Sequence, residues 1–359
     1  MKILLATGGT GGHIFPALHV ANILKEKGHE ILFIGVLNKV EDKIRQKGFK
    51  IAHLSAKGLT FNSLKSVLAS SYCMSKAFIE SIRLIKEFKP EVVCGFGGYA
   101  SFSVVLAAKF LGYPVMIHEQ NVIPGRANAI LAKLVDQIAI SFKKSEQFFK
   151  SPKAVLTGCP CYGRLPTLTK GEALARFQLQ PNKVTILILG GSQGSHRINV
   201  EFVKTAQLLK EMIDFQIIHL TGQQDYGYLD QQYKTLNVVY RLFSFLDDMI
   251  SVYSAADVVV ARAGAVTISE IVAFGLPSVL IPYPFAGGHQ KENAHVLCDV
   301  NMATVIDDQE LTSEKLKKAI LAWVNKKMEP NEVRNRLQEI YCPDAAQNVA
   351  AEIICLAKG

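Results

Sequence analysis

Two glycine-rich segments, each lying between an apolar run and an amphipathic stretch, constrain the fold most strongly. Residues 3–13 read Ile-Leu-Leu-Ala-Thr-Gly-Gly-Thr-Gly-Gly-His, and residues 186–196 read Ile-Leu-Ile-Leu-Gly-Gly-Ser-Gln-Gly-Ser-His. Later in each half, a Gly-x-Pro sequence introduces another apolar run, at residues 112–117 and 275–281. Two motifs that recur in the same order in both halves indicate two similar domains.

Short apolar runs alternate with amphipathic stretches along both halves. The expected strands cover residues 31–35, 92–94, 115–118, 184–189, 216–220, 257–260 and 278–282. Strands covered on both faces are apolar throughout, and helical stretches such as 196–212 separate them, so the pattern predicts an α/β protein with parallel sheets. The aperiodic, proline-containing stretch 158–170 is the expected linker. Two Rossmann-like domains with an interdomain cleft would result.

The charge balance narrows the class of partner. The 40 Lys and Arg residues exceed the 31 Asp and Glu residues, giving a net charge of +9. A basic chain favours acidic partners, such as nucleic acid, an anionic lipid surface or phosphorylated substrates. Nucleic acid is rejected, because the chain lacks Arg clusters with interleaved aromatic residues. No window approaches about 18 uninterrupted apolar residues, and no secretory signal is evident, so any membrane contact is expected to be peripheral.

The seven cysteines are scattered, and only Cys159 and Cys161 stand close together, as C-x-C. Nothing near them completes a zinc site, and the pattern favours a reducing cytosolic compartment. No Asp-x-Asp box for a phosphate-bound cation is evident. We therefore expect neither a metal ion nor a cofactor.

The glycine-rich turns suit phosphate. Between a strand and a helix, such a turn brings backbone N–H groups close to phosphate oxygens, and the helix dipole adds to the attraction. Neither turn has the dinucleotide fingerprint with its acidic partner, and no P-loop sequence is present. In the second turn, Ser192 and Ser195 add hydroxyl donors that suit a diphosphate. Alternatively, both segments are only tight turns packed under a sheet.

Polar residues gather around the first turn. His13 is expected at a helix N-terminus, where the dipole disfavours the imidazolium and leaves a neutral ring able to accept a proton. Alternatively, His13 only caps the helix. The sequence His118-Glu-Gln-Asn121 ends an apolar run, and Gly95-Phe-Gly-Gly-Tyr99 is a further glycine-rich strand exit. So many polar groups at strand ends favour a site.

A second polar strip runs through the other half. Residues 257–270 leave a buried strand and enter a helix, at the strand end where α/β sheets bind ligands. Glu270 is expected in the first turn of that helix, where it accepts ribose hydroxyls or is only favoured by the dipole. Arg262 is expected to neutralise a phosphate or to hold Glu270. The amides of Gln290 and Asn293 match sugar hydroxyls and share a helix face, although such residues are also common on surfaces.

Together these motifs closely resemble the MurG family, the peptidoglycan N-acetylglucosaminyltransferases of glycosyltransferase family 28. The shared motifs are Gly8–His13 with Pro16, Gly95–Tyr99, His118–Asn121, Gly190–Gly194, Phe245–Met249, and Arg262–Glu270 with Gln290 and Asn293. The resemblance implies a GT-B fold. An N-terminal acceptor- and membrane-binding domain would span 1–160 with a C-terminal helix at about 343–359, and a UDP-GlcNAc-binding domain would span 161–342.

The same resemblance implies a reaction. GlcNAc would pass from UDP-GlcNAc to the C4 hydroxyl of MurNAc in undecaprenyl-pyrophosphoryl-MurNAc-pentapeptide, with inversion at the anomeric carbon, converting lipid I to lipid II in peptidoglycan synthesis. It further implies a peripheral enzyme on the cytoplasmic face of the bacterial inner membrane, with cell-wall synthesis and division proteins as partners.

The resemblance also assigns residues. The expected UDP-GlcNAc contacts are Thr10, Gly11, Gly12, Asn121, Ser192, Leu246, Ala265, Val266, Thr267, Ile268, Ser269, Glu270, Gln290 and Asn293. Within this set, the Leu246 backbone would read uracil and Ser192 would bind the diphosphate. The family's linker carries an arginine where this chain has Tyr162, and we expect Arg164 to reach in from a shifted loop instead.

The attacking hydroxyl needs a base within hydrogen-bond reach, for which His13 is the first candidate and Glu119 the second. A lipid acceptor also requires approach to a membrane. Residues 64–88 are expected to form a helix whose apolar side chains lie beside basic ones, which suits an anionic surface. Alternatively, this helix only packs on its own sheet.

Two other functions stay open on the sequence. Another GT-B enzyme, such as a UDP-GlcNAc epimerase or a lipid-disaccharide synthase, would keep the same turns, although an epimerase needs no lipid acceptor. A nucleotide-binding regulatory module would keep the turns but need not keep His13, Gln290 and Asn293.

Overall fold

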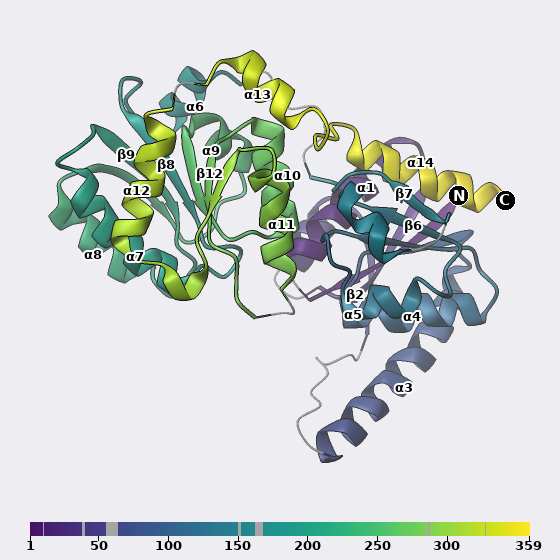
Figure 1. The fold of residues 1–359 in the computed structure, drawn as a ribbon. Helices are drawn as coiled ribbons and strands as arrows, with labels where there is room; N and C mark the ends of the chain where they lie inside the picture. The colour runs from purple at the N-terminus through teal and green to yellow at the C-terminus, as the bar shows by residue number, and fades with distance from the viewer. Residues whose placement is uncertain are drawn as a thin grey trace. The chain divides into compact units, whose positions relative to one another are not determined.

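The computed structural model describes residues 1–9, 11–37, 40–54, 64–149, 152–161, 168–285, 288–326 and 328–359. The chain forms two compact units: unit 1 contains Met1–Gly163 and Cys342–Gly359, and unit 2 contains Arg164–Tyr341. Each unit is a parallel β-sheet covered by helices (Figure 1). The alternation of strands and helices therefore predicted the α/β class correctly.

The sheet of unit 1 has seven parallel strands in the order β3-β2-β1-β4-β5-β6-β7. The strands are β1 (Lys2–Gly8), β2 (Glu30–Val36), β3 (Lys50–His53), β4 (Val92–Gly95), β5 (Val115–Glu119), β6 (Gln137–Ile140) and β7 (Ala154–Leu156). The helices are α1 (Gly11–Glu26), α2 (Glu41–Gln46), α3 (Leu64–Phe88), α4 (Tyr99–Phe110), α5 (Arg126–Leu131), the 3-10 helix η2 (Lys143–Phe148) and α14 (Ala345–Lys358). Because β1, β4 and β5 are neighbours, their carboxyl ends meet at one edge of the sheet.

Strand β1 contributes to two cores. Ile3 and Leu5 pack with buried residues of α1 and α14, whereas Leu4 and Ala6 pack with buried residues of α3 and α4. Successive side chains of a strand point to opposite faces of its sheet. This burial on both faces explains why the strand is apolar throughout, as expected for a central parallel strand.

Helix α14 belongs to unit 1 although it follows unit 2 in sequence. It lies beside α1 (Figure 1), with Val349, Ala350 and Ile353 fully buried. Asn348 Nδ2 donates a 3.3 Å hydrogen bond to the Thr157 carbonyl, which fixes the start of α14 beside the end of β7.

The sheet of unit 2 has six parallel strands in the order β10-β9-β8-β11-β12-β13. The strands are β8 (Val184–Leu189), β9 (Phe215–Leu220), β10 (Val239–Phe243), β11 (Val258–Ala261), β12 (Ser278–Leu280) and β13 (Ala303–Val305). The helices are α6 (Lys170–Arg176), α7 (His196–Leu209), α8 (Tyr226–Leu236), α9 (Met249–Ala255), α10 (Ala265–Phe274), α11 (His289–Cys298), the 3-10 helix η3 (Asp308–Glu310), α12 (Ser313–Val324) and α13 (Pro330–Leu337). The predicted strands lie within a few residues of those observed, and the helix expected at 196–212 ends at Leu209.

Helix α3 spans the predicted residues and has two different faces. Ala77, Ser81 and Ile85 are buried at a spacing of four residues, and α3 packs on α4. The alternative interpretation was a helix packed on its own sheet, and on this face Ile85 does join the core of sheet residues such as Leu4 and Ile34. Tyr72 and Ile79 are exposed, at 72% and 67% of their surface. Among the described residues, no helix is long and apolar enough to span a membrane.

Candidate active site

In unit 1, three chain segments converge where β1, β4 and β5 end. The segment after β4 approaches the first glycine-rich turn so closely that only glycine fits. A Cβ on Gly98 (φ 82°) would lie 2.5 Å from the Gly8 carbonyl oxygen, and one on Gly97 (φ 89°) would lie 2.8 Å from His13 Cδ2. Gly11 and Gly12 open α1, as expected, while Thr10 lies outside the described residues.

His13 is the third residue of α1 and is partly buried beside Gly97. Burial lowers the pKa of His13, while the nearby Glu119 carboxylate and a hydrogen bond with the Gly8 backbone oppose that shift. The ring is therefore neutral near pH 7, as a general base must be. The helix dipole led to the same expectation, but burial is the main cause.

Glu119 ends β5 with both carboxylate oxygens occupied. Oε1 accepts hydrogen bonds from Asn121 N at 2.9 Å and Asn121 Nδ2 at 3.1 Å. Oε2 accepts from Gly125 N at 3.0 Å and Asn128 Nδ2 at 2.9 Å. Four donors on a carboxyl that is 1% exposed make Glu119 the anchor of the loop after β5. This arrangement suits a positioning role better than the role of base.

The neighbours of Glu119 complete a rigid edge. Gln120 Nε2 donates to the Phe96 carbonyl at 3.0 Å and joins β5 to the end of β4. His118 Nε2 lies 3.1 Å from the Gly158 carbonyl, and burial lowers the pKa of His118 to about 4. Asn121 is held on two sides, because its carbonyl accepts from Ser145 Oγ at 3.2 Å. The structure thus places His13 and Asn121 on one prearranged framework.

In unit 2, the second glycine-rich turn lies between β8 and α7. A Cβ on Gly190 would lie 2.3 Å from Ser195 N, and one on Gly194 (φ 82°) would lie 2.0 Å from the Thr221 carbonyl oxygen. Ser192 is exposed at the tip of this turn. Tight backbone packing and an open serine fit the predicted phosphate turn.

Helix α10 presents a second N-terminus at the same edge. It begins at Ala265 after Gly264, which provides no side-chain cap, so the first-turn N–H groups of Ala265, Val266 and Thr267 have no intrahelical acceptor. Ile268 is fully buried and packs the helix on its sheet. Ser269 Oγ donates to the Ala265 carbonyl at 3.0 Å.

Glu270 corrects one prediction, because it is the sixth residue of α10 and lies outside the first turn. Favourable interaction with the dipole therefore does not explain it. Its Oε2 accepts a 2.8 Å hydrogen bond from the Tyr253 hydroxyl. Burial raises the pKa of Glu270 to about 7, and this hydrogen bond opposes the rise.

Arg262 is held within unit 2 by groups other than Glu270, and its predicted interaction with a phosphate stays a prediction. Its Nη1 pairs with Asp308 Oδ1 at 2.5 Å and donates to the Ile281 carbonyl at 3.1 Å. Its Nη2 donates to Ser195 Oγ at 2.8 Å. The Ser195 oxygen is therefore engaged as an acceptor within unit 2, while its O–H group can still donate, so its predicted role as a diphosphate donor stays a prediction.

Gln290 and Asn293 lie on α11, and both bind the loop after β11. Gln290 Oε1 accepts from Ala263 N at 3.1 Å and from Tyr283 N at 2.9 Å. Asn293 is fully buried, and its Nδ2 donates to the Ala263 carbonyl at 3.2 Å. Asn293 is therefore not a surface residue, and its amide nitrogen shapes the loop. Leu246 is half-buried in the segment between β10 and α9.

The linker residues Tyr162 and Arg164 lie outside the described residues, so their predicted roles stay predictions. Among the described residues, no group of three or more His, Cys, Asp or Glu side chains is arranged to hold a metal ion.

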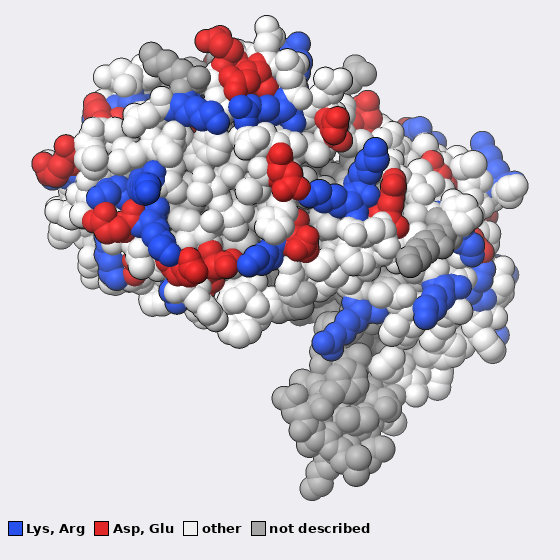
Figure 2. All heavy atoms as spheres, in the orientation of Figure 1, with Lys and Arg blue, Asp and Glu red and all other residues white. Residues whose placement is uncertain are grey.

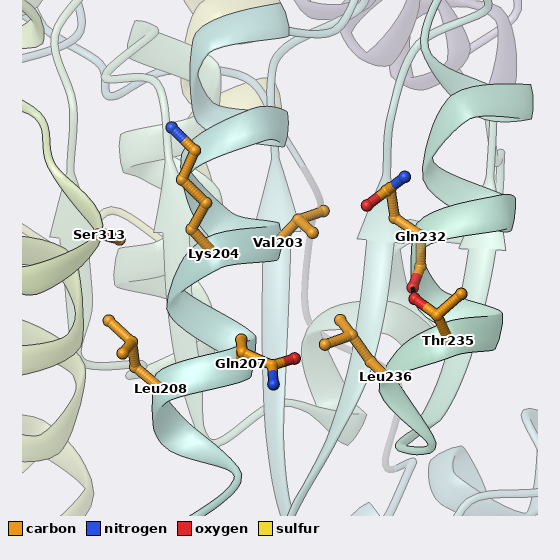
Figure 3. A pocket seen from close by; sticks show the side chains of 8 residues that line it. All are labelled: Val203, Lys204, Gln207, Leu208, Gln232, Thr235, Leu236 and Ser313. Carbon is orange, nitrogen blue, oxygen red and sulfur yellow. Dashed lines mark hydrogen bonds between the residues drawn. The ribbon is translucent and has the colours of Figure 1, made fainter.

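Unit 2 also has a shallow groove, which lies on its helices and not at the strand ends (Figure 3). It is lined by Val203, Lys204, Gln207, Leu208, Gln232, Thr235, Leu236 and Ser313.

Comparison with known proteins matches both halves of the chain. Residues 3–140 match the glycosyltransferase family 28 N-terminal domain, and residues 185–349 match the glycosyltransferase family 28 C-terminal domain. A Halothermothrix orenii protein is 39% identical over 336 residues, covering 90% of this chain and 91% of its own length. It is named "UDP-N-acetylglucosamine--N-acetylmuramyl-(pentapeptide) pyrophosphoryl-undecaprenol N-acetylglucosamine transferase". The chain belongs to glycosyltransferase family 28.

Further members of family 28 support this assignment. A Bacillus subtilis protein of the same name is 36% identical, over 96% of this chain and 97% of its own length. The crystal structure of Acinetobacter baumannii MurG superposes with a TM-score of 0.76 at 27% identity, covering 99% of each chain. The two Rossmann-like sheets of this family 28 chain therefore have the GT-B fold that the motifs predicted, and the chain is a glycosyltransferase.

Proposed function

We propose that this glycosyltransferase moves GlcNAc from UDP-GlcNAc to the C4 hydroxyl of MurNAc in undecaprenyl-pyrophosphoryl-MurNAc-pentapeptide, inverting the anomeric centre and converting lipid I to lipid II. The observation that carries the proposal is that relatives named for this transfer align along nearly the whole chain, at 39% identity in one case.

Unit 2 is proposed to bind the donor. Its two open helix N-termini, at α7 and α10, attract anions because backbone N–H groups and the helix dipole point outward there. Ser192 lies on the glycine-rich turn that precedes α7. The leaving UDP would carry developing negative charge, which these donors stabilise without reorganising.

Each of the other residues expected to contact UDP-GlcNAc is supported by a different observation. Glu270 offers a carboxylate for the ribose hydroxyls, and the Leu246 backbone lies on the loop proposed to read uracil. Gln290 is already fixed by Ala263 and Tyr283, so its amide group is oriented before a sugar arrives. Such prior fixing lowers the entropic cost of binding. Arg164 remains proposed as a phosphate contact in place of the arginine of the family.

Unit 1 is proposed to bind the acceptor. The neutral His13 ring serves as the base that takes the proton of the attacking hydroxyl. Glu119 raises the pKa of His13 and so favours the imidazolium that forms during transfer. We therefore assign Glu119 as a positioning group for His13 and Asn121, in place of the second candidate base.

Unit 1 is also proposed to contact the membrane peripherally. It holds 22 of the 40 Lys and Arg residues but only 12 of the 31 Asp and Glu residues. On the face drawn in Figure 2, both signs are interleaved over unit 2. Exposed Ile79 lies on α3 within one helical turn of the basic Lys76 and Arg83, and exposed Phe110 packs against Phe78 of the same helix. Apolar groups beside cations suit an anionic bilayer, here the cytoplasmic leaflet of the inner membrane.

The proposed reaction is tested by incubating the full chain with UDP-GlcNAc and a lipid I analogue and following the disaccharide product. UDP-glucose is the matched donor control, and we expect it to be a poor substrate. A reaction with UDP-GlcNAc alone would detect epimerisation. Absence of transfer to the lipid-linked acceptor would refute the proposal. Binding to cell-wall synthesis and division proteins is a separate part of the proposal.

A further inference from the structure

Ser195 occupies the N-cap position of α7 without capping it. A serine at this position normally accepts a hydrogen bond from a backbone N–H in the first turn of its helix. The Ser195 side chain makes no such bond. Its Oγ accepts instead from Arg262 Nη2 at 2.8 Å. Arg262 therefore draws the capping oxygen away from the helix.

The direction of Arg262 is itself fixed. Its Nη1 pairs with Asp308 Oδ1 at 2.5 Å, and each of the two side chains is only 11% exposed. The Tyr283 ring centroid lies 5.5 Å from the guanidinium carbon. A planar guanidinium presents donors in a rigid fork, so the pairing with Asp308 on one branch also orients the branch that reaches Ser195.

We propose that Arg262 is a positioning residue that keeps the N-terminal N–H groups of α7 open for the diphosphate of the nucleotide sugar, with Asp308 as its fixing counter-ion. This inference rests on the proposed donor site of unit 2. The first N–H groups of a helix lack intrahelical acceptors, and a serine cap would occupy one of them. With Ser195 held by Arg262, that donor stays available to a phosphate oxygen. Arg262 acts through Ser195 and needs no contact with the phosphate.

The test measures the Kd of UDP by calorimetry on the full chain, for wild type, Arg262→Gln, Ser195→Ala and the double variant. We expect Arg262→Gln to weaken UDP binding about fivefold, the equivalent of one side-chain cap, because the released hydroxyl now competes for the helix N–H. Ser195→Ala alone should leave the Kd unchanged. The double variant should recover wild-type affinity, because no hydroxyl remains to compete.

Arg241→Gln is the matched control, because the Arg241 guanidinium also holds backbone carbonyls, those of Phe177 and Gln178, and its loss should leave the UDP Kd unchanged. Arg262→Lys, which keeps a charge opposite Asp308, replaces Arg262→Gln if that variant does not fold. A double variant as weak as Arg262→Gln, or an Arg262→Gln protein that binds UDP like wild type, overturns the inference. Failure of the wild type to bind UDP would instead refute the proposed donor site.

Discussion

The Tyr253 hydroxyl, on α9, donates a 2.8 Å hydrogen bond to Glu270 Oε2, on α10. Two opposing effects meet at this carboxyl: burial raises its pKa to about 7, and the Tyr253 hydrogen bond favours the charged form. A carboxylate only accepts hydrogen bonds, whereas a protonated carboxyl also donates one. The charge state of Glu270 therefore decides how well it can hold ribose hydroxyls.

The KM for UDP-GlcNAc should fall as the pH rises through about 7, because Glu270 ionises there. Tyr253→Phe removes the bond that favours the carboxylate, so this inflection should move to higher pH. Glu270→Gln should abolish the inflection and raise KM at every pH. Steady-state kinetics across the pH range provide the measurement, and an unmoved inflection in Tyr253→Phe would contradict this account.

The same group should affect stability. Its folded-state pKa of about 7 lies above the ordinary value of 4.5, so the folded chain holds this proton over a pH range in which the unfolded chain has lost it. The contribution of Glu270 to the free energy of unfolding is therefore complete below 4.5 and declines as pH rises to about 7. Urea unfolding of Glu270→Gln should lack this decline, which wild type should show.

His13→Ala should lower kcat for transfer by about 10²- to 10⁴-fold, the usual contribution of a general base. Since the proposed UDP contacts lie in unit 2, the Kd of UDP should not change. His53→Ala, an exposed histidine paired with Glu41, is the control and should keep wild-type kcat. Burial lowers the pKa of His13, so activity in the wild type should persist below pH 6.5 before this base is protonated. Unchanged transfer by His13→Ala would remove it as the base.

Gly98→Ala should destabilise the protein far more than Gly28→Ala. Both glycines have positive φ, 82° and 80°, so both substitutions carry the cost of a left-handed backbone, about 1 kcal/mol. Only at residue 98 would the new Cβ meet the Gly8 carbonyl oxygen, at 2.5 Å, while residue 28 has open space. Thermal unfolding of the two variants measures the difference, and equal midpoints would contradict the close approach.

Phe110→Glu should release the protein from anionic vesicles. Phe110 is 74% exposed on unit 1, and a carboxylate there replaces apolar contact with repulsion from anionic lipid. Met212→Glu is the matched control, because Met212 is 57% exposed but lies on unit 2. Sedimentation with vesicles of anionic and of neutral lipid is the measurement. Retention of Phe110→Glu on anionic vesicles would contradict the proposed surface.

The sequence predicted the two sheets, because their local signals are strong. A glycine-rich turn indicates backbone geometry, and an apolar run such as 184–189 indicates a buried strand. Each signal is contained in a few consecutive residues. The positions of His13 at a helix start and of Ser192 in a glycine-rich turn followed directly. The motif resemblance then supplied the fold family.

Pairings between distant residues were not predictable in the same way. Arg262 and Asp308 are 46 positions apart, and an acidic residue after a strand carries no local signal that identifies its partner. Tyr253 resembles any buried aromatic residue until its hydroxyl is placed beside Glu270. The prediction placed Glu270 one helical turn too early, because the sequence alone does not show at which residue α10 begins. The partners of Arg262 and Glu270 and the first residue of α10 become clear only in the folded structure.

The return of α14 to unit 1 has a consequence for biogenesis. On the ribosome, residues 345–358 are synthesised after all of unit 2, so the cavity beside α1 that Val349 and Ile353 fill stays unsealed while residues 164–341 emerge and fold. Unit 2 can thus mature while unit 1 still lacks part of its interior. A chain that ends before α14 would therefore lack part of the core of unit 1 and would expose the apolar surface that α14 covers.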